Sequence, residues 1–257
     1  MFVLVEQICA ARVSRVALGS LPVPSRLRPK TELAADAILV GDPGRSLLLA
    51  QELLVEPKMS NHARGLWGYT GLTAAGDELT IQTTGMGGPS AALVLADLAK
   101  LGVRRVARVG TCVATGPEVT LGELLLPGEA IAGGGSAAAF GLATGEVAPA
   151  DAGLLERLRE ELVAGATGSA AREVAVESLD TMPPPRTSSP SASSPLAADM
   201  QTVAVFARAG ELGIAAAAVL IVSDVGEEQL ADEALDEAAK RAGRAAAKAL
   251  SNPQVEG

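Results

Sequence analysis

Short Val- and Leu-rich runs alternate with Ala- and Leu-rich segments through most of this 257-residue chain. The apolar runs include residues 37–40, 104–111 and 214–222, and segments with the spacing of amphipathic helices lie between them. Strands that alternate with helices of this length are typical of α/β proteins. We therefore predict a single three-layer α/β domain over residues 36–257, with a central mixed β-sheet flanked by helices, preceded by an N-terminal lead-in over residues 1–35.

The expected helices cover residues 45–54, 89–102, 151–163 and 198–212, and a final helix begins at Glu227. The expected strands cover residues 37–40, 104–111, 122–128, 172–180 and 214–222, with a hairpin over 65–85 that turns at residues 75–77. The final helix begins with acidic residues and ends with Lys240, Arg241, Arg244 and Lys248, the polarity that its macrodipole prefers. Residues 183–195, "PPPRTSSPSASSP", are expected to form a low-complexity, mobile loop.

The composition excludes several classes of function. Hydrophobic residues make up 48% of the chain but aromatic residues only 2%, so the core must consist of Ala, Val and Leu. A net charge of -9 argues against binding to nucleic acid. The longest apolar run, residues 213–222, is too short to cross a membrane, and the N-terminal residues lack the basic start of a signal peptide. Cys9 and Cys112 form no CxxC motif, and His62 is the one histidine, so we expect a cytoplasmic protein without a metal or other cofactor.

The stretch "ILVGDPGRS" ends an apolar run with Gly41, Asp42, Pro43, Gly44 and Arg45. Glycines let backbone N–H groups approach an anion, a helix that begins at the arginine adds a favourable dipole, and the guanidinium fork suits phosphate. The alternative is an ordinary turn between a strand and a helix, with the arginine in solvent. The motif alone does not decide between them.

Three further motifs each allow two interpretations. The glycine cluster in "TTGMGGPSAA", residues 83–92, is either an open ligand-binding loop at a strand end or a site of close packing. Arg108, in the apolar run "RVARVGTCVAT", is either a buried charge with a partner or an outward residue of an edge strand. Asp224, in "IVSDVGEE", is either a general acid or an N-cap of the last helix.

Taken together and in this order, "GDPGR", "NHARGLWGYTG", "TTGMGGPSAA", "RVGTC" and "VSD" resemble the nucleoside phosphorylase family of purine nucleoside and uridine phosphorylases. The resemblance is close over residues 37–117 and looser from residue 199 onward. It implies that Gly41, Arg45, Arg108 and Thr111 bind phosphate. It also implies that Arg64 binds phosphate in the site of a neighbouring subunit, and therefore a homo-oligomer that is dimer-based and could be a hexamer.

The reaction that the resemblance implies is phosphorolysis, in which phosphate is the co-substrate and attacks the sugar carbon while the base leaves. Asp224 matches the aspartate with which purine members protonate the departing base. Val113, Met182, Met200 and Gln201 occupy the positions that contact the nucleoside. The implied partners are thus a nucleoside and inorganic phosphate.

Several nucleoside positions depart from the family pattern. Residues 199–201 read Asp-Met-Gln where the family has Glu-Met-Glu, and Gln201 cannot hold two sugar hydroxyls with a charged carboxylate. Met182 and Pro183 stand where hexameric purine enzymes have aromatic residues, and Val113 replaces a glycine beside the base. The arginine that assists the catalytic aspartate has no counterpart in "GEEQLADEA", and the family's N-terminal histidine is absent.

Three hypotheses follow. The leading one is a nucleoside phosphorylase of the purine type, although "GGPS" at residues 87–90 is more similar to the uridine branch. A nucleosidase that uses water is disfavoured, because it has little use for a full set of arginines. The third is a non-catalytic phosphate- or nucleotide-binding member of the family, which fold alone does not exclude.

Overall fold

A computed structural model describes residues 26–116, 118–165, 171–182 and 195–251. The larger strands are β1 (Asp36–Val40), β2 (Leu54–Asn61), β3 (Gly68–Thr73), β4 (Glu78–Thr83), β5 (Arg105–Ala114), β6 (Leu124–Ala132), β8 (Arg172–Ser178) and β10 (Ala215–Val225). Three short strands are β7 (Val147–Pro149), β9 (Ala197–Asp199) and β11 (Glu228–Gln229). The helices are α2 (Pro43–Leu53), α3 (Gly88–Lys100), α4 (Ala152–Ala164), α5 (Thr202–Leu212) and α6 (Asp232–Leu250), with short 3-10 turns η1 (Ala63–Gly65) and η2 (Gly135–Phe140).

The strands form one mixed sheet in the order β11-β10-β6-β8-β9-β5-β1-β4-β3-β2. β1 runs parallel to both β4 and β5, whereas β3 lies antiparallel to β2 and β4. An additional parallel pairing of β5 with β10 joins the two halves, so that β5, β9, β8, β6 and β10 close into a ring. The predicted fold class, a mixed sheet between helices, is confirmed, but the ring was not foreseen because no local pattern specifies it.

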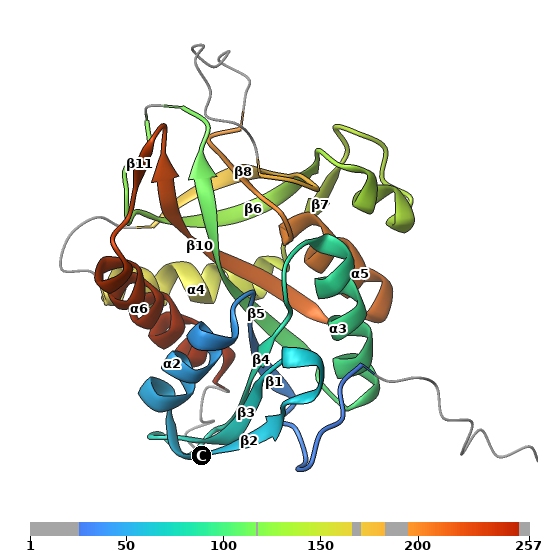
Figure 1. Cartoon of the computed structure of the whole chain (residues 1–257), viewed down its shortest axis with the longest axis vertical. Helices are drawn as coiled ribbons and strands as arrows, with labels where there is room; N and C mark the ends of the chain where they lie inside the picture. Colours follow the sequence, from blue (N-terminus) through green and yellow to red (C-terminus); the bar gives the residue numbers. More distant parts are fainter. Residues whose placement is uncertain (1–25, 117, 166–170, 183–194, 252–257) are drawn as a thin grey trace, which may run out of the picture.

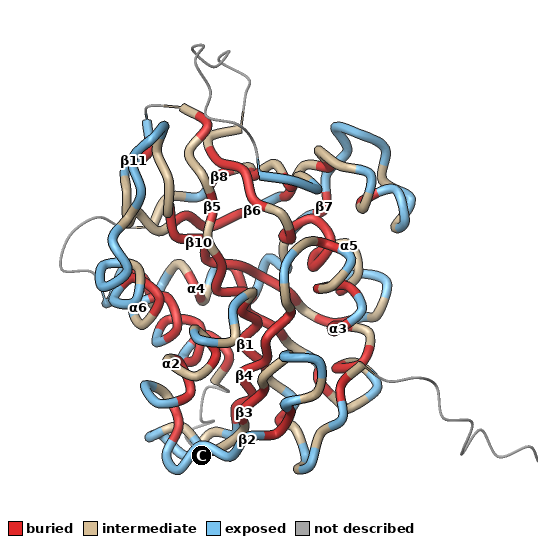
Figure 2. Tube along the Cα trace, viewed as in Figure 1, coloured by how far each residue is buried: buried red, intermediate tan, exposed pale blue. Residues whose placement is uncertain are grey.

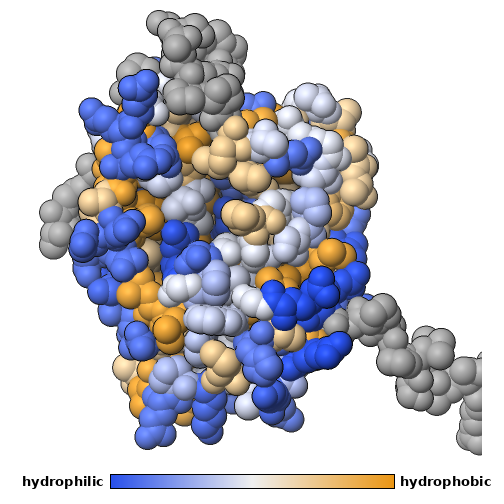
Figure 3. All heavy atoms as spheres, viewed as in Figure 1, coloured by the Kyte–Doolittle hydropathy of each residue, from blue (hydrophilic) through white to orange (hydrophobic). Residues whose placement is uncertain are grey.

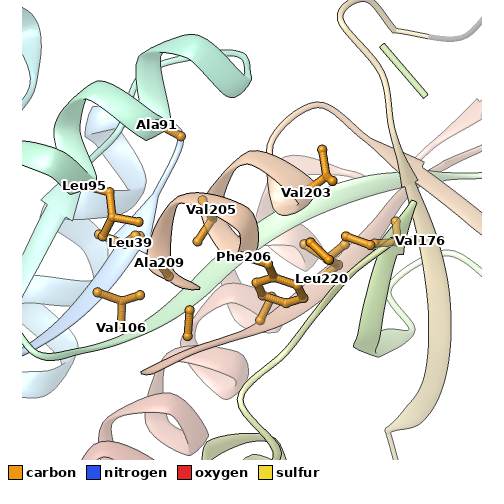
Figure 4. Close-up of a cluster of buried hydrophobic side chains, with 14 of the residues drawn as sticks. Leu39, Ala91, Leu95, Val106, Val176, Val203, Val205, Phe206, Ala209 and Leu220 are labelled. Atoms are coloured by element: carbon orange, nitrogen blue, oxygen red, sulfur yellow. The ribbon is translucent and has the colours of Figure 1, made fainter. Parts of the chain in front are cut away.

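Helices cover both faces of the sheet: α3 and α5 lie on one side, and α2, α4 and α6 on the other (Figure 1). Strand periodicity explains this arrangement, since successive side chains point to opposite faces. In β1, Leu39 joins the core under α3 and α5, whereas Ile38 and Val40 join the core under the other helices. Figure 4 shows Leu39 and Val106 of the sheet facing α3 and α5.

The core is made of small and aliphatic side chains, as the composition predicts. Buried residues follow the central strands and the inner sides of the helices (Figure 2). Among the described residues, Tyr69 and Phe206 are the aromatic side chains that are buried. Helix α6 shows how alanine serves this purpose: its buried face is almost entirely alanine, so the helix approaches the sheet closely.

Two helices begin later in the sequence than predicted. The helix expected from Ala198 begins at Thr202, because residues 197–199 pair with β5 and β8 instead. The helix expected from Glu227 begins at Asp232, because residues 228–229 return along β10 as β11. Strand β2 was also not predicted: its sequence, LVEPKMSN, is largely exposed and contains Pro57, which suits an edge strand.

Residues 26–35 lie against the domain. The backbone N–H groups of Arg26 and Leu27 donate to the buried carboxylate of Asp97 in α3, and the N–H of Ala34 donates to Thr80 in β4. The division at residue 35 into lead-in and domain stays a prediction. The loop expected over residues 183–195 lies almost wholly outside the described residues.

Candidate functional site

A cavity of about 210 Å³ opens where β1 and β4 end, beside the second half of β5. These strands are parallel, so their carboxyl ends meet at one edge of the sheet, the place where α/β proteins bind ligands. Several sequence-predicted residues line the cavity: Gly41, Arg45, Arg108 and Thr111 from the phosphate set, and Met182, Met200 and Gln201 from the nucleoside set. The fold therefore brings together residues that lie up to 160 positions apart, counted from Gly41 to Gln201.

The Gly-Asp-Pro-Gly-Arg motif forms the start of α2. Asp42 is the N-cap, and its Oδ1 accepts the N–H of Arg45 at 2.8 Å, while Pro43 occupies the first turn. A helix beginning at Arg45 was expected, but it begins two residues earlier. Because the Asp42 carboxylate already occupies this helix end, an anion here would be bound mainly by the Arg45 side chain.

Arg45 is not a solvent arginine, as the plain-turn interpretation required. Its side chain is half-buried and lines the cavity, and within the described residues its guanidinium has no hydrogen-bond or ion-pair partner. Burial lowers the pKa of Arg45, the charge of Asp42 opposes that shift, and the nearby Arg108 reinforces it. A buried, partly uncompensated charge of this kind favours an anionic ligand.

Arg108 is buried, with 4% of its surface exposed, so the interpretation of an outward residue on an edge strand is wrong. Its Nη2 lies 2.9 Å from Oδ2 of Asp199, which is itself buried. Nη1 donates to Oε1 of Gln201 at 2.9 Å, and Nε donates to Oγ1 of Thr202 at 3.3 Å. These contacts use three of the five guanidinium N–H groups, leaving one on each terminal nitrogen.

Two local features hold this arginine in place. A Cβ added at Gly110 would lie 2.5 Å from Cζ of Arg108, so only glycine lets the guanidinium fold along its own strand. Asp199 also accepts hydrogen bonds from Ser178 and from the backbone and hydroxyl of Thr202. Arg108 is thus oriented by a buried network before any ligand binds.

Gln201 belongs to the same network. It is 3% exposed, and its Oε1 accepts from Arg108 and from Thr84 Oγ1 at 3.2 Å. Its Nε2 donates to the main-chain oxygens of Gly85, at 2.5 Å, and Gly87, at 3.3 Å. The amide therefore ties Arg108 to the glycine loop that follows β4. Both of its polar atoms are occupied by protein groups.

The remaining predicted residues lie outside the cavity lining. Arg64 is exposed on η1, in a left-handed conformation (φ 60°, ψ 20°) that is uncommon for a residue other than glycine. Val113 pairs with Asp224 on one side and with Ala198 on the other. Asp224 does not cap the last helix, whose N-cap is Ala231; its carboxylate instead accepts from Ser223 at 2.6 Å and from Gln229 at 2.9 Å.

The structure adds cavity residues that the motifs alone had not singled out. Met86 lies between the two glycines with positive φ that follow β4, and 87% of its surface is exposed. Asp199 is the buried partner of Arg108. Cys112 also lines the cavity, and burial, reinforced by the charge of Asp199, raises the pKa of its thiol. The glycine spacing could have indicated Met86, but nothing local identified Asp199 as an ion-pair partner.

Two further findings concern ligands and membranes. Within the described ranges, no group of three or more His, Cys, Asp or Glu side chains is arranged to hold a metal ion. No helix in the described part of the chain combines the length and apolar character needed to span a bilayer.

A cavity with two arginines at the carboxyl edge of a mixed sheet defines an α/β protein of the kind that binds small molecules at strand ends. Residues 36–252 match the model of the phosphorylase superfamily, and the chain belongs to that superfamily. The resemblance drawn from the motifs is thereby confirmed.

The relatives point in the same direction. The purine nucleoside phosphorylase DeoD-type of Geobacillus kaustophilus is 31% identical over 206 residues, which are 79% of this chain and 87% of the relative. The proteins of the same name from Oceanobacillus iheyensis and Chromobacterium violaceum are 40% identical over 96 residues and 36% identical over 94 residues. These two matches cover 37% and 36% of this chain, and 40% and 39% of the respective relatives.

Proposed function

We propose that this protein catalyses the phosphorolysis of nucleosides to free base and (deoxy)ribose 1-phosphate, with purine nucleosides as its substrates. The observation that carries the proposal is the pair of arginines in one cavity, of which Arg45 has no described partner and Arg108 keeps two N–H groups. Relatives named purine nucleoside phosphorylase support the purine assignment.

Phosphate is proposed to lie between Arg45 and Arg108. The two guanidinium groups would share its negative charge, which would offset both the burial that mainly lowers the pKa of Arg45 and the repulsion from Arg108 that adds to it. Thr111 adds a hydroxyl, and Gly41 leaves its backbone bare where a side chain would crowd the ion. Arg64, which is exposed and does not line the strand-end cavity, is proposed to bind phosphate in the site of a neighbouring copy in a dimer-based or hexameric assembly.

The chemistry follows from this placement. A phosphate oxygen attacks the anomeric carbon, the bond from that carbon to the base nitrogen breaks, and the base leaves with the bonding electron pair. Asp224 is proposed to give its proton to the base and to recover one from solvent. The arginines hold the phosphate in line with the breaking bond. The negative charge of the bound phosphate then stabilises the positive charge that develops on the sugar.

The nucleoside side is proposed to consist of Val113, Met182, Met200 and Gln201. Met182 is 53% exposed, so an apolar side chain is available to cover a planar base. Val113 pairs directly with Asp224 and would place the base beside the acid. Because Gln201 already bonds Arg108 and the glycine loop, we propose that it contacts the sugar less strongly than a glutamate would.

Gln201 also favours a second candidate function, a phosphate- or nucleotide-binding protein without turnover. Its amide is fully engaged by the protein, so the sugar side of the cavity offers fewer free polar groups than the phosphate side. Uridine-type specificity remains an alternative within the first function, and hydrolysis by water is the least favoured outcome.

The test is release of base from inosine, adenosine and uridine, with and without phosphate, together with direct measurement of phosphate binding. Phosphate-dependent release from the purine nucleosides supports the proposal, and faster release from uridine replaces the purine assignment with the uridine one. Equal release without phosphate identifies a nucleosidase. Phosphate binding without any release identifies the non-catalytic alternative. Size measurement by light scattering tests the proposed homo-oligomer, and fractionation of cells tests the proposed cytoplasmic location.

A further inference from the structure

A second cavity, of about 180 Å³, lies between α4, α6 and the beginning of β6. It shares no lining residue with the cavity at the strand ends. The reaction proposed above therefore gives this cavity no role.

The basic end of α6 lines this cavity. In the sequence, these basic residues were noted only because they stand at the end of a helix that begins with acidic residues. Arg241, Arg244 and Lys248 stand three and then four positions apart, so they share one face of the helix. Over α6, Figure 3 shows hydrophilic and hydrophobic residues intermingled. This local concentration of positive charge contrasts with the net charge of -9 of the whole chain.

The described carboxylates near these cations compensate them incompletely. Arg244 is paired with Glu52 at 2.5 Å, and Lys248 reaches Glu161 at 3.6 Å, a loose pair. Arg241 forms no ion pair with a described carboxylate; its Nη2 donates at 3.3 Å to the backbone oxygen of Gly122.

The other acidic side chain of the lining, Glu123, is already paired with Arg172, at 3.0 Å. Neighbouring Lys240 is paired with Glu237, at 2.7 Å, and does not line the cavity. Among the described residues, the guanidinium of Arg241, which has no ion-pair partner there, and the loosely held ammonium of Lys248 therefore remain to bind an anion.

The floor of the cavity is apolar, formed by Leu124, Leu162, Ala171 and Ala245. A ligand that matches both features carries an anionic head and a short, compact stem. The volume supports this size, since an apolar cavity of about 150 Å³ accommodates benzene. A guanidinium fork binds a phosphoryl group through two parallel hydrogen bonds.

We propose that this second cavity binds a small phosphate monoester, with its phosphoryl group on Arg241 and Lys248 and its carbon stem on the apolar floor. The ligand's two negative charges would compensate the unpaired Arg241 and draw Lys248 away from Glu161. The site is independent of the proposed phosphorolysis, so the two proposals fail separately.

The experiment is equilibrium dialysis of the full chain with labelled ribose 5-phosphate, with inorganic phosphate as competitor. It is carried out on the natural chain and on the Arg45→Met variant, in which the strand-end cavity lacks its free arginine. In both proteins, Arg241→Gln is expected to weaken ester binding to the second cavity at least about tenfold, because a charge-assisted hydrogen bond is lost. Lys240→Gln is the matched control, because it removes the same charge from the same helix outside the cavity and leaves binding unchanged.

A second variant tests the same idea in the opposite direction. Glu161→Gln removes a lining carboxylate and is expected to tighten binding by about threefold to fivefold. The proposal is overturned if the Arg45→Met protein binds no ester, if Arg241→Gln leaves binding unchanged, or if Lys240→Gln weakens it equally. Displacement of half or more of the bound ester by an equal concentration of inorganic phosphate would also overturn the monoester, since the carbon stem would then contribute nothing to the affinity.

Discussion

The two sides of the strand-end cavity differ in whether their polar side chains already have hydrogen-bond partners in the protein. Around Arg45, a half-buried guanidinium has no described hydrogen-bond or ion-pair partner, so a charge that Asp42 and Asp236 compensate only in part faces the cavity. Around Gln201, both polar atoms of a buried amide bond to protein groups. Arg108 lies between the two, with its orientation set by Asp199 and part of its donor capacity still free.

The difference shows that the two arginines of this site have different roles, one structural and one electrostatic. Arg108 belongs to the buried framework, so its removal leaves the Asp199 carboxylate without a counter-charge. Arg45 contributes little to that framework, but it makes the electrostatic potential inside the cavity more positive. Variants at these positions should therefore separate folding from ligand binding.

The largest effect is expected for Arg108→Met. The free energy of unfolding should fall by about 3–5 kcal/mol, because the buried carboxylate of Asp199 loses its partner. Urea denaturation measures it, and adding Asp199→Asn to the same chain should recover a large part of the loss. A loss below about 1 kcal/mol would show that the pair does not hold the site together.

Arg45→Met is the matched substitution on the other side. We expect kcat/KM for phosphate-dependent base release to fall by about 100-fold to 1000-fold, because a preorganised charge at the phosphate is lost. The unfolding free energy should change by less than about 1 kcal/mol, since no described group bonds to that guanidinium. If Arg45→Met and Arg108→Met lowered the free energy of unfolding equally, the two arginines would not differ in their structural roles.

Asp224→Ala separates proton transfer from anchoring of the β10–β11 hairpin. If Asp224 is the general acid, kcat should fall about 100-fold while the dissociation constant for phosphate stays within about twofold. Gln229→Ala removes one hydrogen bond to the same carboxylate and serves as the control. Parallel losses of turnover and of phosphate affinity would assign Asp224 a structural role.

The smallest effect is expected for Gln201→Glu. A carboxylate oxygen would replace the amide that donates to Gly85 and Gly87, so the unfolding free energy should fall by about 1–3 kcal/mol. The same carboxylate should lower KM for ribonucleosides severalfold, because it accepts hydrogen bonds from sugar hydroxyls more strongly than an amide. Unchanged affinity for the sugar would show that it does not bind at this position.

Much of the fold was predictable because it is local. Alternation of apolar residues identified β1, β5 and β10, and the hairpin turn at residues 75–77 lies between β3 and β4. The segments that were missed are short or exposed. β9 and β11 consist of three and two residues, too few for a period to be recognised, and each exists only because a longer strand lies beside it.

For the site, the motifs predicted which residues line the cavity better than they predicted what those residues do there. Gly41, Arg45, Arg108, Thr111 and Gln201 come together as a cavity lining. Their hydrogen bonds could not be predicted, because the partners of Arg108 lie about ninety positions away, at residues 199–202.

The sequence by itself determined the alternation of strands and helices, the alanine-rich core and the membership of the phosphorylase superfamily, since each depends on residue type and local order. The tertiary structure decided that Arg108 is paired whereas Arg45 has no partner among the described residues, and that the basic end of α6 lines a cavity. The physical reason is that charge compensation depends on distance in space. Spacing along the chain places Arg108 in a strand, but only the folded chain brings Asp199 to within 2.9 Å of it.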